Sequence, residues 1–191
     1  PFRENSLLLD FLTQERGRFS AIARGTRNPK SGKKAILQPF LALQISVTGK
    51  SELQILKDVE AIPPGIQLVG DALFAAMYIN ELIVKLLSGH DAEPDLFAYY
   101  SSTLQDLSAG KDLEVVLRRF ELALLDCLGY ALNLHYEAET NTEIAPTGQY
   151  YLQPDTGFVR LQGETQAGSV GNMLFPGVDL LAIGSDDFTA L

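Results

Sequence analysis

The amino-acid sequence predicts an α+β fold with a small N-terminal β-barrel, a following α-helical domain and a small β hairpin near the C-terminus. Three observations predict this order. Apolar and polar residues alternate in the first third, as they do on half-buried strands. After Pro63-Pro64-Gly65 the period changes to that of helices. Near residue 150, two short apolar runs flank a Pro-Asp-Thr-Gly turn.

Residues 1–62 form the first predicted domain. An apolar run at 6–12 is followed by a turn and a second strand at 19–24. Apolar residues then occupy every second position over 41–48, and the chain returns over 53–59 as the hairpin partner. Several short strands with polar turns predict a small barrel, of which the OB-fold is a leading option.

Residues 63–135 form the predicted helical domain. The stretch 68–88 is apolar on most sides, which indicates a largely buried helix. A second helix begins at Pro94. For the third, over 113–128, Asp112 is the expected N-cap and Gly129 the expected stop.

Residues 136–191 form an irregular segment with a hairpin of strands at 149–153 and 158–161. Gly and polar residues dominate 162–177, and 178–191 is too short to finish a domain convincingly. We expect this segment to pack on the helical domain and to be truncated at its C-terminus.

The composition is that of a globular, water-soluble protein, with 46% hydrophobic and 20% charged residues. No run approaches the roughly 18 apolar residues needed to cross a bilayer, and the N-terminus has no secretory signal. We therefore expect a cytoplasmic protein that does not associate with a membrane. Cys127 is the only cysteine, which excludes an internal disulfide and a cysteine-built zinc site.

Charge is distributed unevenly along the chain. The formal net charge is −9, yet residues 1–62 carry ten Lys/Arg and six Asp/Glu. The stretch 16–34 contains seven cations and no acid, and such local charge density is what an approaching anion senses. We expect these cations to bind DNA: Arg16, Arg18, Arg24, Arg27, Lys30, Lys33 and Lys34.

Catalytic and cofactor-binding patterns are missing. Six residues lie between Gly25 and Gly32 where a P-loop has four, and Lys34 replaces the Ser/Thr that would bind magnesium. His90 and His135 fit surface histidines better than bases, and Cys127 fits a small core residue. The sequence thus predicts no catalytic residues, no metal site, no cofactor and no enzymatic activity.

Several motifs in a fixed order resemble those of one known family. In that order and spacing, over about residues 1–135, the sequence is similar to the bacterial recombination mediator family RecO; from residue 136 the resemblance is weak. The motifs are RENSLLLD at 3–10, GRF at 17–19, ARG at 23–25, LQPF at 37–40, YINEL at 78–82, LRRFEL at 117–122 and LGY at 128–130.

The resemblance implies an N-terminal OB-fold and an α-helical second domain in a nucleoid-associated, cytoplasmic protein of bacteria. It implies binding of single- and double-stranded DNA, annealing of complementary strands, and help for RecA in replacing single-strand-binding protein (SSB). The implied partners are RecR and the acidic C-terminal tail of SSB.

The sequence departs from this family in three places. Many relatives place a four-cysteine zinc module after the LGY motif, which we expect residues 136–163 to replace by packing of the hairpin itself. Relatives begin with a further strand before Pro1, so we expect the first barrel strand to be missing or trimmed. They also continue into a basic C-terminal helix that is absent after Leu191.

The basic stretch suits a single-strand binder of the OB type, which combines a positive groove with aromatic faces. Phe19 and Phe40 are stacking candidates, although both fit barrel core equally well. No residues are arranged to read base edges, so we expect sequence-tolerant binding. The alternative is a protein-interaction adaptor whose basic loop and helical domain bind acidic partner tails.

The third predicted helix carries the candidate site for the SSB tail. An Arg fork can hold a carboxylate, and an apolar gap between helices can take the ring of a terminal aromatic residue. The alternative is that Arg118 and Arg119 pair with nearby acids such as Glu114 or Glu121, and for Arg119 we prefer it. The residues expected at the tail site are Arg118, Phe120, Leu124 and Leu128.

Overall fold

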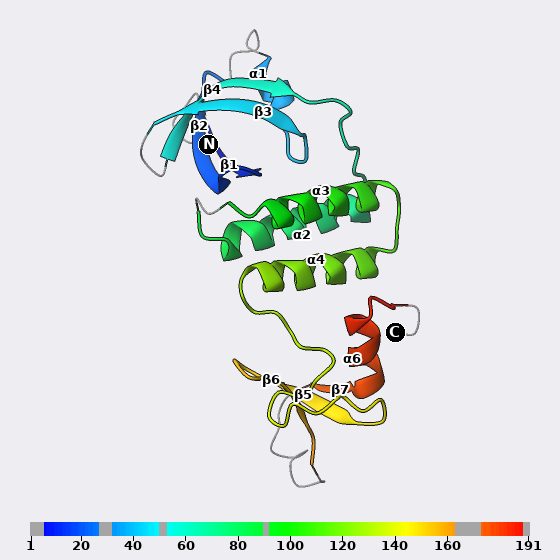
Figure 1. Ribbon diagram of the computed structural model, residues 1–191. Helices are drawn as coiled ribbons and strands as arrows, with labels where there is room; N and C mark the ends of the chain where they lie inside the picture. Colours follow the sequence, from blue (N-terminus) through cyan, green and yellow to red (C-terminus); the bar gives the residue numbers. More distant parts are fainter. Residues whose placement is uncertain (1–5, 27–31, 50–52, 90–91, 163–172, 189–191) are drawn as a thin grey trace. The chain divides into compact units, whose positions relative to one another are not determined.

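The computed structural model describes residues 6–26, 32–49, 53–89, 92–162 and 173–188 (Figure 1). The chain divides into two compact units, Pro1–Leu128 and Gly129–Leu191, and each is described by itself. The first unit contains both the N-terminal sheet and the helices, and it ends seven residues before the boundary predicted after residue 135. Sheet and helices belong together because side chains of the sheet reach the helical core.

The sheet of the first unit has four strands in the order β1-β2-β4-β3. Strands β1 (Ser6–Thr13) and β2 (Gly17–Arg24) form an antiparallel hairpin. Strand β4 (Leu53–Ala61) runs parallel to β2 and antiparallel to β3 (Leu43–Thr48). The sheet is not closed, but it is OB-like, and the predicted α+β class is confirmed.

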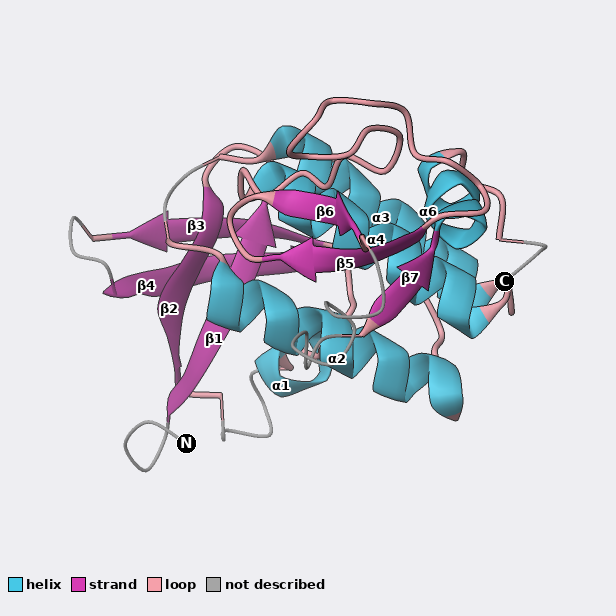
Figure 2. Ribbon diagram, turned by 90° about the horizontal axis from the view of Figure 1, so that it is seen from below, coloured by secondary structure: helices cyan, strands magenta, loops and turns pink. Residues whose placement is uncertain are grey.

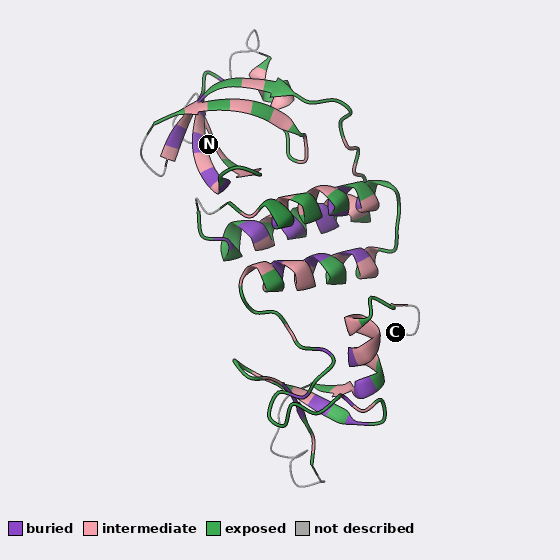
Figure 3. Ribbon diagram, viewed as in Figure 1, coloured by how far each residue is buried: buried purple, intermediate pink, exposed green. Residues whose placement is uncertain are grey.

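Alternation along the strands produces the core of this sheet. Every second residue of β2 is buried, from Gly17 to Ala23, which Figure 3 shows as repeated purple segments. Ala23, Leu37 and Leu56 form the buried centre, and apolar side chains of β1 and β3 pack around them. The short helix α1 (Lys33–Ile36) was not predicted, because four residues are too few to show a helical period.

Three helices complete the first unit: α2 (Asp71–Leu86), α3 (Pro94–Ser108) and α4 (Leu113–Cys127). All three were predicted, but α2 begins three residues later than expected. Gly70, with a φ of 57° and a ψ of −134°, lies outside the helical region and so fixes the start at Asp71. Asp112 is the N-cap of α4, where its carboxylate accepts the Val115 N–H at 3.1 Å.

Residues of the sheet and its loops pack against the helical core. Leu12 of β1 and Phe40, between α1 and β3, both contact this core. The buried members come from the three helices and from Leu87, the residue that follows α2: Ala75, Ala76, Ile79, Ile83, Leu87, Leu96, Leu104, Leu107, Val116, Phe120 and Leu124. The sheet is therefore seated on the helices through apolar contacts at separate points of the chain.

In the described part of the second unit, helix α6 accompanies a small three-stranded sheet (Figure 2). The hairpin of β5 (Gln149–Gln153) and β6 (Gly157–Arg160) is the predicted one. Strand β7 (Leu174–Pro176) and helix α6 (Gly177–Gly184) were not predicted. Gly177 allows the start of α6 to approach the backbone of Ala145 closely, because a Cβ at this position would lie 2.0 Å from the Ala145 carbonyl oxygen.

The core of the second unit needs the unpredicted helix. Leu180 of α6 is buried together with Leu134, Ile144, Tyr150 and Phe158. Residues 178–191, in which the sequence indicated no element, thus supply Leu180 to this core. Periodicity missed this helix because it has only eight residues and begins at a glycine.

A buried carboxylate organises the segment before the hairpin. Glu137 is 5% exposed, and its carboxylate accepts hydrogen bonds from Thr140 Oγ1 at 2.7 Å, Thr142 Oγ1 at 3.2 Å and the Arg160 backbone N–H at 3.1 Å. The Ala138 N–H donates to the carbonyl of Phe158 at 2.9 Å. Hydrogen bonding from Thr140 lowers the pKa of Glu137 below its usual value.

Candidate functional site

The basic stretch begins at Arg16, before β2, includes all of β2 and ends in α1. Two of its predicted DNA-binding cations, Arg27 and Lys30, lie outside the described residues. Arg24 and Lys34 are exposed, whereas Lys33 is half-buried and its Nζ donates to the carbonyl of Lys57 at 3.2 Å. The contact joins α1 to β4.

Lys57 is a cation of this surface that the sequence did not indicate. Strands β2 and β4 are parallel, with Ile22 opposite Ile55. Arg24 and Lys57 each lie two residues further along these strands, and both side chains are exposed. We call Arg24, Lys33, Lys34 and Lys57 the basic end of the sheet. It collects four cations from three elements.

Arg16 lies in the turn between β1 and β2 and is engaged within the sheet. One guanidinium nitrogen donates to the Gln54 side chain at 3.1 Å, and its Cζ lies 4.9 Å from the centre of the Phe19 ring. Phe19 is buried and also contacts Phe11, with ring centres 5.8 Å apart. Phe19 is therefore core, and its ring has no open face for a base.

Arg18 connects the sheet to a helix end. Its Nε donates to the carbonyl of Leu87 at 3.2 Å, at the C-terminus of α2. Its Nη1 lies 3.0 Å from Asp10, which also accepts from Ser20 at 2.7 Å. Last-turn carbonyls lack helical partners, so a guanidinium there is a favourable C-terminal cap. The side chain is only 20% exposed, which leaves it little surface for a phosphate.

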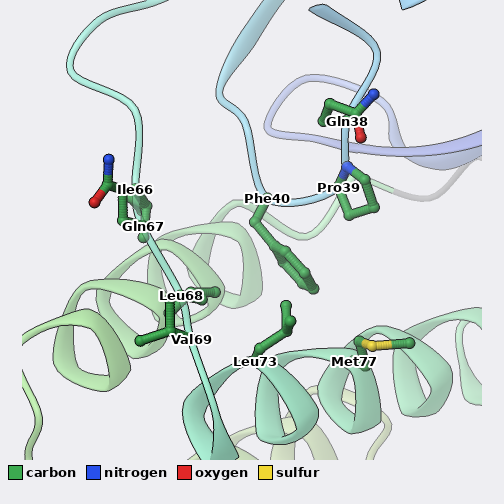
Figure 4. Close-up of a pocket in the computed structure, with 9 residues that line it drawn as sticks. All are labelled: Gln38, Pro39, Phe40, Ile66, Gln67, Leu68, Val69, Leu73 and Met77. Atoms are coloured by element: carbon green, nitrogen blue, oxygen red, sulfur yellow. The ribbon is translucent and has the colours of Figure 1, made fainter. Parts of the chain in front are cut away.

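Phe40 is the second stacking candidate, and it points away from the sheet. Its backbone has a φ of 67°, and its ring is directed towards Leu73 and Met77 of α2 (Figure 4). The ring lines a cavity of about 410 Å³. The other lining residues are uncharged: Gln38, Pro39, Ile66, Gln67, Leu68, Val69, Leu73 and Met77. The contact with the helical core accounts for Phe40 without a nucleobase.

Helix α4 carries the candidate tail site. Phe120 is 0% and Leu124 is 2% exposed, so neither offers surface for direct contact with a peptide. Leu128 is half-buried against the same core. Arg118 is exposed and forms an ion pair with Glu121, one of the local acids that the alternative interpretation names. The remaining carboxylate oxygen of Glu121 accepts the Tyr78 hydroxyl of α2 at 2.8 Å.

The hydrogen bond to Glu121 changes the chemistry of Tyr78. It raises the pKa of Tyr78, because an ionised phenol would lie beside the carboxylate. One helical turn earlier, Phe74 is 69% exposed. The exposed surface of α2 is thus partly aromatic, although the apolar pattern of this helix predicted a largely buried element.

The described residues offer little for catalysis. No group of three His, Cys, Asp or Glu side chains could hold a metal ion within the ranges that the structure describes. Burial raises the pKa of the half-buried Cys127 thiol to about 11, so it is a poor nucleophile. His135 is exposed, with Nε2 3.3 Å from the carbonyl of Gly184, and His90 lies outside the described residues. None of the described helices is both long and apolar enough for a transmembrane span.

Two family models match the chain. The model described as recombination protein O N terminal matches residues 1–64, and the one described as recombination protein O C terminal matches residues 67–171. The DNA repair protein RecO of Alteromonas mediterranea is 39% identical over all of this chain and 80% of its own length. That of Methylococcus capsulatus is 44% identical over 87% of this chain and 69% of its own.

Proposed function

Because the chain belongs to the RecO family of DNA repair and recombination proteins, we propose that it is a non-catalytic recombination mediator. It binds single- and double-stranded DNA, anneals complementary strands and, with RecR, helps load RecA onto single strands covered by SSB. The family supports the role in DNA repair. On this basis we propose DNA binding, strand annealing and RecA loading as its individual activities.

The observation that carries the proposal is the basic end of the sheet. Arg24, Lys34 and Lys57 are exposed in a chain whose net charge is −9, so a phosphate backbone is attracted to the basic end of the sheet rather than to the molecule as a whole. Charge neutralisation of this kind is independent of sequence, since it involves no base edge. It suits a protein that must act on any damaged DNA.

The test compares binding and annealing of two oligonucleotide pairs of unrelated sequence. We expect affinities within about threefold of each other, a steep fall in affinity with salt, and faster annealing than without protein. Failure to bind either strand at low salt would overturn the proposal. If the protein then still bound an acidic peptide, the adaptor function would replace it.

We further propose that Arg118 receives the acidic tail of SSB. The Arg118 side chain is 63% exposed, and its guanidinium has donors beyond the one that Glu121 uses. Phe74 and Tyr78 supply exposed aromatic surface on the neighbouring helix. Arg118→Glu should abolish binding of a labelled acidic peptide ending in phenylalanine, measured by fluorescence anisotropy. DNA affinity should stay nearly unchanged; an equal loss of both would contradict separate sites.

A further inference from the structure

The tail site contains a carboxylate of its own. Glu121 is ion-paired through Oε2 to the guanidinium that we assign to the tail, and through Oε1 it accepts the Tyr78 hydroxyl at 2.8 Å. Arg118 and Glu121 stand three residues apart on α4, while Tyr78 belongs to α2. The carboxylate is thus held from two helices.

The contacts show which partner of the ion pair is fixed. The Glu121 side chain is 19% exposed and has two anchors, whereas the Arg118 side chain is 63% exposed and donates to Glu121 through Nη1. Swinging the guanidinium outwards breaks this one exposed contact. Moving Glu121 breaks two contacts, one of them across helices. The guanidinium is therefore the mobile member of the pair.

We propose that Glu121 is an internal competitor for the Arg118 guanidinium and sets the affinity of the site for acidic ligands. The inference rests on the proposed binding of an acidic tail. An incoming carboxylate must share the guanidinium with Glu121, which places two like charges side by side, or draw the guanidinium away from it. Either route weakens binding and keeps the complex readily reversible.

Neighbouring acids strengthen the competition. Glu114 is exposed one helical turn before Arg118, and Glu81 is close enough to Tyr78 to contribute to its raised pKa. Lys85 is ion-paired to Glu81 at 2.5 Å. Arg118, the cation that an acidic ligand would bind, thus has acids near it, and Glu121 is already ion-paired to it.

The test is Glu121→Gln, which removes the charge and keeps the shape and an oxygen that can accept from Tyr78. An acidic peptide ending in a phenylalanine carboxylate is the probe, with the full chain and fluorescence anisotropy. We expect about three- to tenfold tighter binding, with the gain shrinking as salt rises. Glu81→Gln is the matched control, because it makes the same change in net charge at a nearby acid that is ion-paired to Lys85 rather than to Arg118; we expect at most a small gain.

Tyr78→Phe distinguishes the effect of the Glu121 charge from the effect of its mobility. The variant removes one hydrogen bond to Glu121 but leaves the charge in place. We expect no gain in affinity from this variant. A gain as large as that of Glu121→Gln, or an equal gain in Glu81→Gln, would overturn the inference. So would weaker or unchanged binding by Glu121→Gln when the parent binds, and the tail proposal would then stand alone. If neither parent nor Glu121→Gln binds the peptide, the tail proposal fails and this inference with it.

Discussion

Glu137→Ala should destabilise the second unit by about 3 kcal/mol. The substitution removes a 5% exposed carboxylate that accepts from two threonine hydroxyls and one backbone N–H. Hydrogen bonds to a charged group contribute about 1.5–3 kcal/mol each. Thr140 and Thr142 are exposed, so in the variant their hydroxyls donate to water, and most of the free energy of these two hydrogen bonds is regained. Most of the expected loss of about 3 kcal/mol comes from the Arg160 N–H, which loses its acceptor, and from the segment around Thr140 and Thr142, which loses the group that orders it.

The assay is hydrogen–deuterium exchange of the full chain, followed over the amides of β5 and β6. A loss of about 3 kcal/mol corresponds to roughly 100-fold faster exchange where those amides exchange by opening of the unit. Glu139→Ala is the control, because it removes an exposed acid two residues away. Equal exchange in the Glu137 and Glu139 variants would refute the assignment of Glu137 as the organising group.

The same carboxylate predicts a pH dependence. The pKa of Glu137 is lowered in the folded protein, so its contribution is complete above the unfolded value of about 4.3. It is lost as the pH falls through the lower, folded value. Exchange of the β5 and β6 amides should therefore become more acid-sensitive in the parent than in Glu137→Ala, once corrected for the intrinsic rate.

Two further predictions concern the first unit. Replacing Arg24, Lys34 and Lys57 by Ala should reduce the slope of log K against log salt by about 0.7–0.9 for each phosphate that is no longer neutralised, whatever the DNA sequence. The control Lys85→Ala should leave the slope unchanged. A parental slope in the folded triple variant would exclude the basic end of the sheet as the DNA-binding surface. Asp112→Ala should lower the free energy of unfolding by about 1 kcal/mol through loss of the α4 cap, and an unchanged urea midpoint would contradict that role.

Periodic patterns made most of the fold predictable. Strand β3 shows a period of two over its six residues, and helices α3 and α4 carry apolar residues at helical spacing. Elements α1 and β7 have four and three residues, which is too short for any period to appear. Helix α6 depends on a close approach between Gly177 and Ala145, which lie far apart in the sequence.

The candidate sites were less predictable, because their residues depend on distant partners. Charge density pointed to the stretch 16–34, but Lys57 lies beside Asp58 and Glu60, where the sequence shows no basic cluster. The helical stripe correctly placed Phe120 and Leu124 on one face, and that face proved to be the core. Sequence spacing allowed the pair of Arg118 with Glu121, but it could not show that Tyr78 completes it.

The two anchors of Arg18 affect how charge-removal experiments on the basic stretch are interpreted. Deleting this guanidinium leaves Asp10 without its cation and the end of α2 without its cap, so the seating of the sheet on the helices changes together with the charge. A drop in DNA affinity in Arg18→Ala would then mix altered geometry with weaker attraction. The two causes separate in the salt dependence: weaker attraction lowers the slope, whereas altered geometry lowers affinity by the same factor at every salt concentration.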